Sequence, residues 1–500
     1  MKQNFLQMLS LAAGLLVAGC NTADNGDMDQ SYGAQFLEKT YEGTMTGIQG
    51  SGDRFDEFTD NPFVATAVTP TSTFSVDADG ASYAIMRCYL KQGYEVNPQS
   101  VRIEEYLNYF TFNYLAPTND ETIAINAEVG QCPWNTDHLL LRLGLKGKEL
   151  QEGEVPLANY VFLVDVSGSM YGSDRLDLLK AGLNELLLHM NPDDRISIVT
   201  YSGTVKKLLE STPVREAGKI SQTISQLMAN GSTAGGEALK MAYEEALANF
   251  DPTCNNRIIM GTDGDFNVGV TNTQELVAMV QEYASRGIYM TCLGFGMGNL
   301  NDQMMEKISN SGNGNYHYID SEDEMMKVFV HERERFVCVA NDTKCQVTFD
   351  STLVSQYRLI GYENRVMSNS DFTDDTKDAG DIGAGQTVTA LYELVPSNLA
   401  SRQSNQTVAT FDVRYKKSLG ADSRPLSRAI TIADIVNKNE RSADFYFAAG
   451  VAAYGMVLRN SPYKGDATYI KAQQLVQQGL TYDPHGYRQE LLQLIDSYIK

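Results

Sequence analysis

Apolar and polar positions along the chain follow two patterns, the alternation of β-strands and the longer period of amphipathic helices. Each pattern dominates different regions of the chain. Between residues 159 and 330, short apolar runs alternate with longer amphipathic segments. A buried strand followed by a helix, repeated several times, is typical of a doubly wound parallel sheet. The runs expected to form this sheet are YVFLVD, RISIVTY, NRIIMGTD, IYMTCLGFG and NYHYID, with KKLLEST as an antiparallel edge strand. We therefore expect an α/β fold in this region.

Segments with the alternation of half-buried strands occur on both sides of that region. Two precede it, ETIAINAEVGQCPW and HLLLRLGLKGKEL, and four follow Phe336: KCQVTFDS, QYRLIGYEN, QTVTALYELVP and TVATFDVRYKK. Because an isolated pair of strands is only marginally stable, we expect both sets to form one β-sandwich into which the α/β region is inserted.

Helical patterns account for most of the remaining chain. The stretch STFSVDADGASYAIMRCYL predicts a strand, a turn and a helix, and VRIEEYLNYFTFNY predicts a second amphipathic helix. After Lys416, the segments ADFYFAAGVAAYGMVLR, TYIKAQQLVQQ and YRQELLQLIDSYI predict a C-terminal helical part.

The first twenty residues combine Lys2, an apolar stretch and a run of small residues that leads into Cys20. This arrangement resembles a bacterial lipoprotein signal peptide, a family in which the cysteine is lipidated. The resemblance implies that Cys20 anchors the chain to a membrane of the cell envelope, for which we expect the outer membrane. An ordinary secretory signal, with no role for Cys20, is the alternative. Residues 21–61 are acidic and rich in glycine, which predicts a flexible tether.

Charge and cysteine content narrow the function classes. Lys and Arg total 40 against 63 Asp and Glu, so the formal charge is −23. Such a chain repels a phosphate backbone, which argues against a nucleic-acid partner. The six cysteines after Cys20 show no CxxC spacing, so a zinc site has no support. Cys338 and Cys345 could pair across a hairpin or could remain buried free thiols.

Oxygen-bearing side chains gather where the predicted parallel strands end. Asp165, Ser167 and Ser169 follow the first strand, and Asp263 follows NRIIMGT. In an open α/β sheet, ligands bind beyond the carboxyl ends of the strands, near the point where the strand order reverses. The glycine-rich loop NGSTAGGEAL adds two further hydroxyls, those of Ser232 and Thr233.

These side chains form a hard, all-oxygen donor set. Carboxylates and hydroxyls without His or Cys suit Mg²⁺ or Mn²⁺ and do not favour zinc or copper. A divalent ion held by few protein oxygens keeps water ligands, and a carboxylate from a partner can replace one of them. The pattern therefore predicts a metal site that a partner completes.

DVSGSM, GSTAGG and TDGDFN together resemble the von Willebrand factor type A domain and its metal-ion-dependent adhesion site. The resemblance implies that Asp165, Ser167, Ser169, Thr233 and Asp263 are the metal-site residues, with Thr233 preferred over Ser232. It also implies that the hydroxyls ligate directly or nearly so, whereas the aspartates often act through water.

Stretches inside and outside this domain resemble a bacterial lipoprotein family in which the domain lies between characteristic N-terminal and C-terminal domains. STFSVDADGASY, VRIEEYLNYF, LGFGMGN and AGDIGAGQTVTALYELVP are among the stretches that carry the likeness. We accordingly divide the chain into a signal peptide (1–20), a tether (21–61), an N-terminal flanking domain (62–156), the type A domain (157–335) and a C-terminal flanking domain (336–500).

Other interpretations of these motifs explain less. Helix capping accounts for one serine in one loop, but not for three loops that supply oxygens. GFGMGN imitates a dinucleotide fingerprint, but Asn299 occupies the third glycine position. The stretch from Asp263 to Asn267 begins like a calcium loop, but Val268 replaces the glycine of the sharp turn. Scattered histidines and the lack of a GxSxG elbow argue against an enzyme.

The sequence thus predicts an envelope-anchored module that binds a partner protein through Mg²⁺ or Mn²⁺. The alternative from another class is a structural envelope scaffold, in which the metal only stabilises the fold and the flanking domains bind partners.

Overall fold

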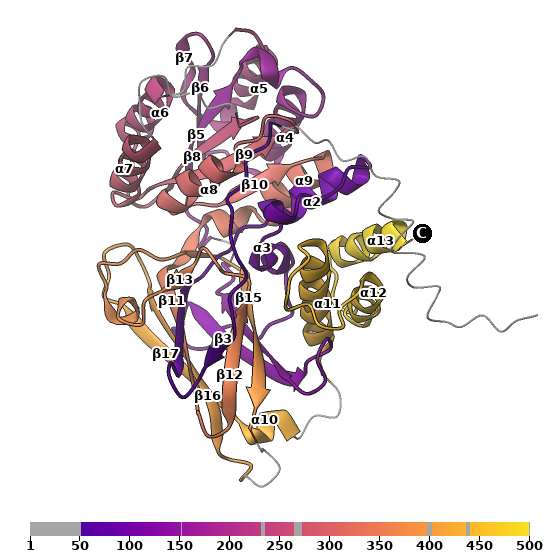
Figure 1. Cartoon of the computed structure of the whole chain (residues 1–500). Helices are drawn as coiled ribbons and strands as arrows, with labels where there is room; N and C mark the ends of the chain where they lie inside the picture. Colours follow the sequence, from indigo (N-terminus) through magenta and orange to yellow (C-terminus); the bar gives the residue numbers. More distant parts are fainter. Residues whose placement is uncertain are drawn as a thin grey trace, which may run out of the picture. The chain divides into compact units, whose positions relative to one another are not determined.

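The computed structural model describes residues 52–151, 153–231, 236–264, 273–397, 403–436 and 441–499. All of them belong to one compact unit, Gly47–Lys500. Within this unit, a parallel sheet with its helices, an antiparallel sandwich and a further group of helices can be followed in Figure 1.

The parallel sheet is built from the apolar runs between residues 158 and 319. In the described residues its strands pair in the order β10-β9-β8-β5-β6-β7, and β7 runs antiparallel to β6. The strands are β5 (Ala158–Asp165), β6 (Arg195–Tyr201), β7 (Val205–Pro213), β8 (Asn255–Thr262), β9 (Ile288–Phe295) and β10 (Tyr316–Ile319). β5 and β8 are buried along their whole length, which fits the apolar runs YVFLV in β5 and IIM in β8.

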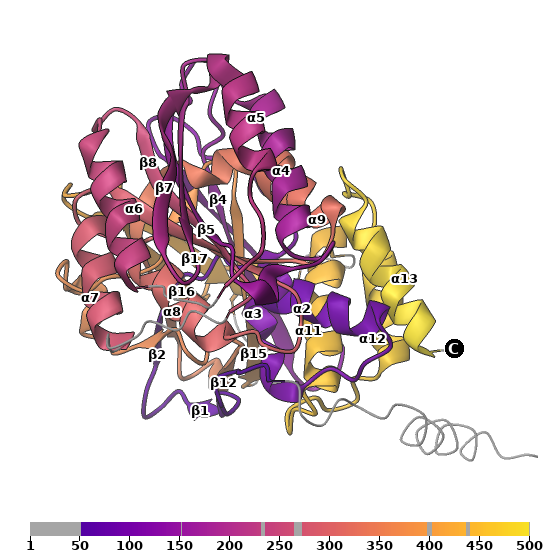
Figure 2. The ribbon, with the colours of Figure 1, turned by 90° about the horizontal axis from the view of Figure 1, so that it is seen from above.

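Helices cover both faces of this sheet, because successive strand side chains point to opposite faces. Val161 and Leu163 of β5 pack with α6, α7 and α8, whereas Phe162 and Val164 pack with α4, α5 and α9. Figure 2 shows α6 and α7 on one side of the sheet and α4 and α5 on the other. The helices are α4 (Leu176–His189), α5 (Ala217–Ser225), α6 (Gly236–Ala248), α7 (Thr273–Ala284), α8 (Asp302–Ser311) and α9 (Glu322–Met326).

The sandwich consists of two antiparallel sheets that share one apolar core. One sheet contains β1 (Val64–Ala65), β12 (Val354–Ile360), β15 (Thr387–Pro396), β4 (Leu139–Gly147) and β3 (Ile123–Gln131), in that order. The other contains β13 (Val366–Met367), β2 (Thr71–Ser75), β11 (Cys338–Phe349), β16 (Thr407–Lys416) and β17 (Arg424–Thr431), and β14 (Ile382–Gly383) pairs with β11.

Each sheet of the sandwich joins strands from before and after the parallel sheet. In one sheet β4 pairs with β15, and in the other β2 pairs with β11. The predicted fold class, a doubly wound sheet inserted in a β-sandwich, is therefore confirmed.

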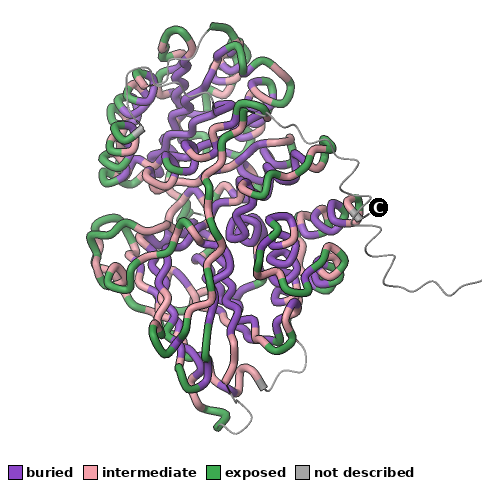
Figure 3. Tube along the Cα trace, in the orientation of Figure 1, coloured by how far each residue is buried: buried purple, intermediate pink, exposed green. Residues whose placement is uncertain are grey.

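A third core is mostly helical and rich in aromatic side chains. α11 is buried on nearly all sides, and its Gly450 allows close contact with α12, since a Cβ there would lie 2.8 Å from the Val476 nitrogen. Figure 3 shows buried positions along both α11 and the parallel strands. None of the described helices has the length and apolar content needed to cross a bilayer. The helices are α2 (Ala81–Lys91), α3 (Ile103–Asn108), α10 (Ile432–Val436), α11 (Ala443–Leu458), α12 (Tyr469–Gln478) and α13 (Tyr487–Ile499).

One local prediction needs correction, and one open alternative is decided. The helix expected over 101–114 ends at Asn108, because other elements bond the backbone that follows: Phe112 N donates to Thr387 Oγ1 (3.2 Å). Of the two alternatives left open for Cys338 and Cys345, the structure shows free thiols, since both residues lie on β11 and do not face each other across a hairpin.

The tether prediction also needs correction where the structure describes it. Asp53 Oδ1 accepts bonds from Gly298 N and Leu300 N, both at 2.8 Å, and Asp60 pairs with Arg459 at 2.9 Å. Residues 52–61 therefore pack against the rest of the chain.

Candidate metal centre

Asp165 and Asp263 stand at neighbouring strand ends. Asp165 is the last residue of β5, and Asp263 directly follows β8, whose Gly261 lies opposite Val164 in the ladder. The chain winds outward from β5 to β7 on one side and from β8 to β10 on the other, so the strand order reverses between β5 and β8. This is the crevice where open α/β sheets bind ligands.

Asp165 is fully buried and held by two hydrogen bonds. Its Oδ1 accepts from Ser167 N (2.8 Å) and its Oδ2 from Thr262 Oγ1 (3.0 Å). Burial raises the pKa of Asp165 to about 6, against the opposing effect of the Ser167 hydrogen bonds, and the nearby Asp263 raises it further. A buried, poorly solvated carboxylate of this kind gains from a cation placed beside it.

The two serine hydroxyls lie together above this carboxylate. A tight turn, Gly168–Met170, brings Ser169 Oγ to 2.9 Å from Ser167 Oγ. Ser167 is buried and Ser169 is exposed, so the pair extends from the interior to the surface.

The third loop reaches the same place as far as the structure describes it. Thr233 lies outside the described residues, as do Ser232, Asp265 and Asn267. Gly231, just before this gap, accepts a bond from Gly168 N (3.1 Å). The loop that carries Thr233 therefore begins against the serine turn.

Arg175 is a neighbour of the site that the sequence analysis did not identify. Its Nε lies 3.9 Å from Asp263 Oδ2, and its NH2 group donates to Met297 O (3.0 Å). The guanidinium fits because position 296 is glycine, since a Cβ there would lie 2.2 Å from Arg175 Nε. An arginine before an amphipathic helix gives no sequence signal for such a role.

The residues described here fit a hard divalent ion. Two buried carboxyl groups and two hydroxyls converge, and Asp263 contributes to the raised pKa of Asp165, which shows that the two carboxyl groups repel each other. A divalent cation relieves that repulsion, and oxygen ligands are those that Mg²⁺ and Mn²⁺ prefer.

A second carboxylate group lies elsewhere and has different neighbours. Oxygens of Asp77, Glu105 and Glu306 come within 4.8 Å of one another. Two guanidinium groups pair with this cluster: Arg365 Nε contacts Asp77 Oδ2 (2.8 Å), and Arg102 bonds Glu105. These carboxyl groups are therefore part of a buried ion-pair network.

Comparison with known proteins decides the family. "Uncharacterized protein YfbK" of Escherichia coli is 37% identical over 470 residues, which cover 89% of this chain and 80% of that protein. The chain belongs to the YfbK family. The family model "Uncharacterized protein YfbK, C-terminal" matches residues 334–500, "von Willebrand factor type A domain" matches 159–331, and "von Willebrand factor" matches 49–142.

Other proteins are similar to this chain at lower identity. Inter alpha-trypsin inhibitor heavy chain 4 of mouse is 29% identical over 38% of this chain and 21% of its own length. A solved structure, "von Willebrand factor type A from Catenulispora acidiphila", covers 77% of this chain and 91% of its own, with 15% identity and a TM-score of 0.44. The type A domain, expected from three loops, is thus confirmed by its family model.

Proposed function

We propose that this YfbK-family chain is an envelope-anchored module that binds a partner protein through a divalent metal, Mg²⁺ or Mn²⁺. Asp165, Ser167, Ser169, Thr233 and Asp263 would hold the ion. The observation that carries the proposal is the meeting of two buried carboxyl groups and a pair of hydroxyls at the reversal point of the sheet. The bound ion would supply a vacant coordination position for an Asp or Glu carboxylate of the partner.

The residues around the site have distinct parts in this proposal. Thr262 and the Ser167 backbone orient the Asp165 carboxylate, and exposed Ser169 presents its hydroxyl at the surface. Arg175 adds positive charge beside Asp263, which favours an incoming carboxylate on a chain that otherwise repels acidic partners.

The proposal includes no catalytic step. In the described part of the chain, histidines pair away from the site: His138 contacts Glu393 (2.6 Å) and His331 stacks on His485. These histidines therefore do not provide a general base beside the metal-site residues.

Anchoring through Cys20 completes the proposal. The signal-peptide pattern of residues 1–20 supports a lipid anchor on the bacterial envelope, with the outer membrane as the expected site. Cys20 lies outside the described residues.

Crosslinking in intact cells, followed by capture and identification of the bound protein, tests the function. We expect Asp165→Ala to lose both the partner and magnesium uptake measured by calorimetry, while its far-ultraviolet circular dichroism stays that of wild type. Asp137→Ala, which removes an exposed carboxylate from another surface, is the matched control and should keep both. Equal capture by Asp165→Ala and wild type would refute the metal-dependent mode.

The structural scaffold is the second candidate, and the buried ion pairs between segments favour it. Arg102 of the N-terminal flank joins Asp302 of α8 through bonds of 2.6 and 3.0 Å. If the scaffold is correct, partner capture survives Asp165→Ala even though magnesium uptake is lost.

A further inference from the structure

The loop between β9 and α8 connects the metal centre with the segment that enters from the N-terminal side. We call this loop, residues 296–301, the rim loop. On one side it contacts Arg175 and Gly264, and on the other side it contacts residues 52–54. A stretch that precedes the first strand of the chain therefore reaches the surroundings of the metal centre.

The rim loop lies directly against residues of the metal centre. Gly264, which follows Asp263, packs on the loop backbone, since a Cβ at this glycine would lie 2.4 Å from Asn301 N. Met297 O accepts a bond from the NH2 group of Arg175 (3.0 Å), and Arg175 Nε lies 3.9 Å from Asp263 Oδ2. The position of the rim loop therefore limits where the Asp263 backbone and the Arg175 guanidinium can lie.

The N-terminal segment holds the other side of the rim loop through hydrogen bonds. Asp53 Oδ1 accepts from Gly298 N and Leu300 N, both at 2.8 Å. Gly52 N donates to Gly298 O (3.0 Å). Arg54 N donates to Leu300 O (2.8 Å). One carboxylate thus satisfies two backbone N–H groups, and charge-assisted bonds of this type are roughly twice as strong as bonds between neutral groups.

The Asp53 carboxylate is bonded on both of its oxygens. Tyr89 of α2 donates its hydroxyl proton to Asp53 Oδ2, so the carboxylate also joins the segment to α2. Leu300 is buried, which keeps water from readily replacing the acceptor of its N–H group. Removal of this carboxylate would therefore loosen the rim loop more than the loss of an exposed contact would.

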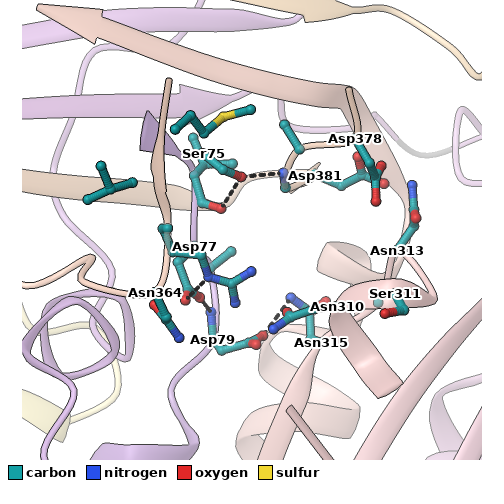
Figure 4. A pocket seen from close by; sticks show the side chains of 18 residues that line it. Ser75, Asp77, Asp79, Asn310, Ser311, Asn313, Asn315, Asn364, Asp378 and Asp381 are labelled. Carbon is teal, nitrogen blue, oxygen red and sulfur yellow. Dashed lines mark hydrogen bonds and ion pairs between the residues drawn. The ribbon is translucent and has the colours of Figure 1, made fainter. Parts of the chain in front are cut away.

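The helix that follows the rim loop has supports of its own. At its start, Asp302 pairs with Arg102 through bonds of 2.6 and 3.0 Å. Beyond its end, at the cavity drawn in Figure 4, Asn315 Nδ2 donates to Asp79 Oδ1 (3.3 Å). Loss of the bonds to Asp53 would thus free the rim loop while α8 stays in place.

We infer that Asp53 is a positioning residue of the metal centre, a role that rests on the function proposed for that centre. It acts through the rim loop on Asp263 and Arg175. Attachment of residues 52–54 keeps these groups where they favour the ion and an incoming carboxylate, and release of the segment lowers the affinity for both. Because the segment leads back along the chain to Cys20, tension between a lipid anchor and a bound partner would load these bonds.

Magnesium calorimetry on the full chain in detergent tests this role. Asp53→Ala should bind magnesium about tenfold more weakly than wild type, the lower end of the loss that follows removal of a group supporting metal ligands. Asp53→Asn keeps an oxygen that accepts from Gly298 N and Leu300 N, so it should restore most of the affinity. Asp56→Ala is the matched control and should bind like wild type, because this carboxylate of the same segment bonds Gln303 of α8.

Hydrogen exchange provides a measurement that does not require the metal. In EDTA, residues 296–301 of Asp53→Ala should exchange faster than those of wild type, whereas β8 should exchange at the same rate in both. Coupling between two sites is reciprocal. Magnesium should therefore slow exchange in residues 52–58 of wild type.

The results distinguish failure of this role from failure of the proposed function. If wild type takes up no magnesium, the metal-dependent function is wrong and the role of Asp53 falls with it. If wild type binds magnesium and Asp53→Ala binds it equally well, or if Asp53→Ala and Asp56→Ala lose the same affinity, only the role of Asp53 is wrong. Weaker binding by Asp53→Ala that Asp53→Asn restores supports the role.

Discussion

Burial of the Asp165 carboxylate lowers the free energy of unfolding of the metal-free chain. Its burial raises its pKa to about 6, whereas an unfolded aspartate has a pKa of about 3.9. The folded state therefore binds the proton more tightly, and the free energy of unfolding falls as the pH rises through this window. At neutral pH the charged group destabilises the fold unless a cation is bound.

Asp165→Asn should consequently be more stable than wild type in EDTA at pH 7. The advantage should be on the order of 2–3 kcal/mol at pH 7 and should vanish near pH 4, because one pKa unit corresponds to about 1.4 kcal/mol. Urea unfolding at pH 4, 5, 6 and 7 measures it. A constant difference across these pH values would contradict the prediction.

Magnesium should offset that advantage. At a magnesium concentration of about 100 times the dissociation constant, wild type should gain about 2.7 kcal/mol, and Asp165→Asn should gain little. Thermal unfolding with and without magnesium provides the measurement. A gain of equal size in both proteins would place the ion elsewhere.

Individual site residues could be predicted where a motif directly follows a predicted strand. Four site residues follow strands that the apolar pattern already identified: Asp165, Ser167, Ser169 and Asp263. We could therefore expect these side chains to lie close together. Thr233 stays a prediction. Arg175 could not be found this way, since its neighbours come from distant loops and no local pattern marks it.

At the scale of elements, two glycines in helices have opposite surroundings. Gly182 faces Met325, and a Cβ there would lie 2.1 Å from the Met325 Cγ. Gly182→Ala should therefore lower the free energy of unfolding by about 1–3 kcal/mol through overpacking between α4 and α9. Gly218 in α5 has open space around it, so Gly218→Ala should raise stability by up to about 1 kcal/mol. Urea unfolding of both variants compares them, and a destabilised Gly218→Ala would contradict this account.

Contact between α3 and α8 depends on a buried charge. Arg102 bonds Asp302 and Glu105, and Arg102→Met would leave these carboxylates uncompensated. We expect a loss of about 3–5 kcal/mol in the free energy of unfolding, measured by urea denaturation. Arg215→Met, which breaks an exposed pair with Asp193, should change it by less than about 1 kcal/mol. Similar losses in the two variants would mean that burial is not the cause.

Long elements with a clear period were predictable, and short or edge elements were not. β17 was missed because Arg424, Ser427 and Arg428 make it polar and Pro425 interrupts it, which a strand tolerates at a sheet edge. α3 was predicted too long because aromatic residues after Asn108 continue the apolar pattern while their backbone bonds to other elements.

At the scale of the whole molecule, membrane attachment is expected to depend on one residue. Cys20→Ser should abolish incorporation of labelled fatty acid and move the protein from the membrane fraction to the soluble fraction, because the proposed attachment is the lipid on Cys20. Fractionation of cells that produce each form measures this. Retention of Cys20→Ser in washed membranes would refute the lipid anchor.

The paired arrangement of the sandwich has a consequence for how the chain is made. β3 and β4 leave the ribosome early, but β15 of the same sheet follows only after the entire parallel-sheet region. Until then the early hairpin exposes an apolar face and an open edge, the type of surface that invites aggregation. Truncated chains that end before β15 should thus be preferred substrates for chaperones and proteases. The cell would in this way remove incomplete copies of the protein.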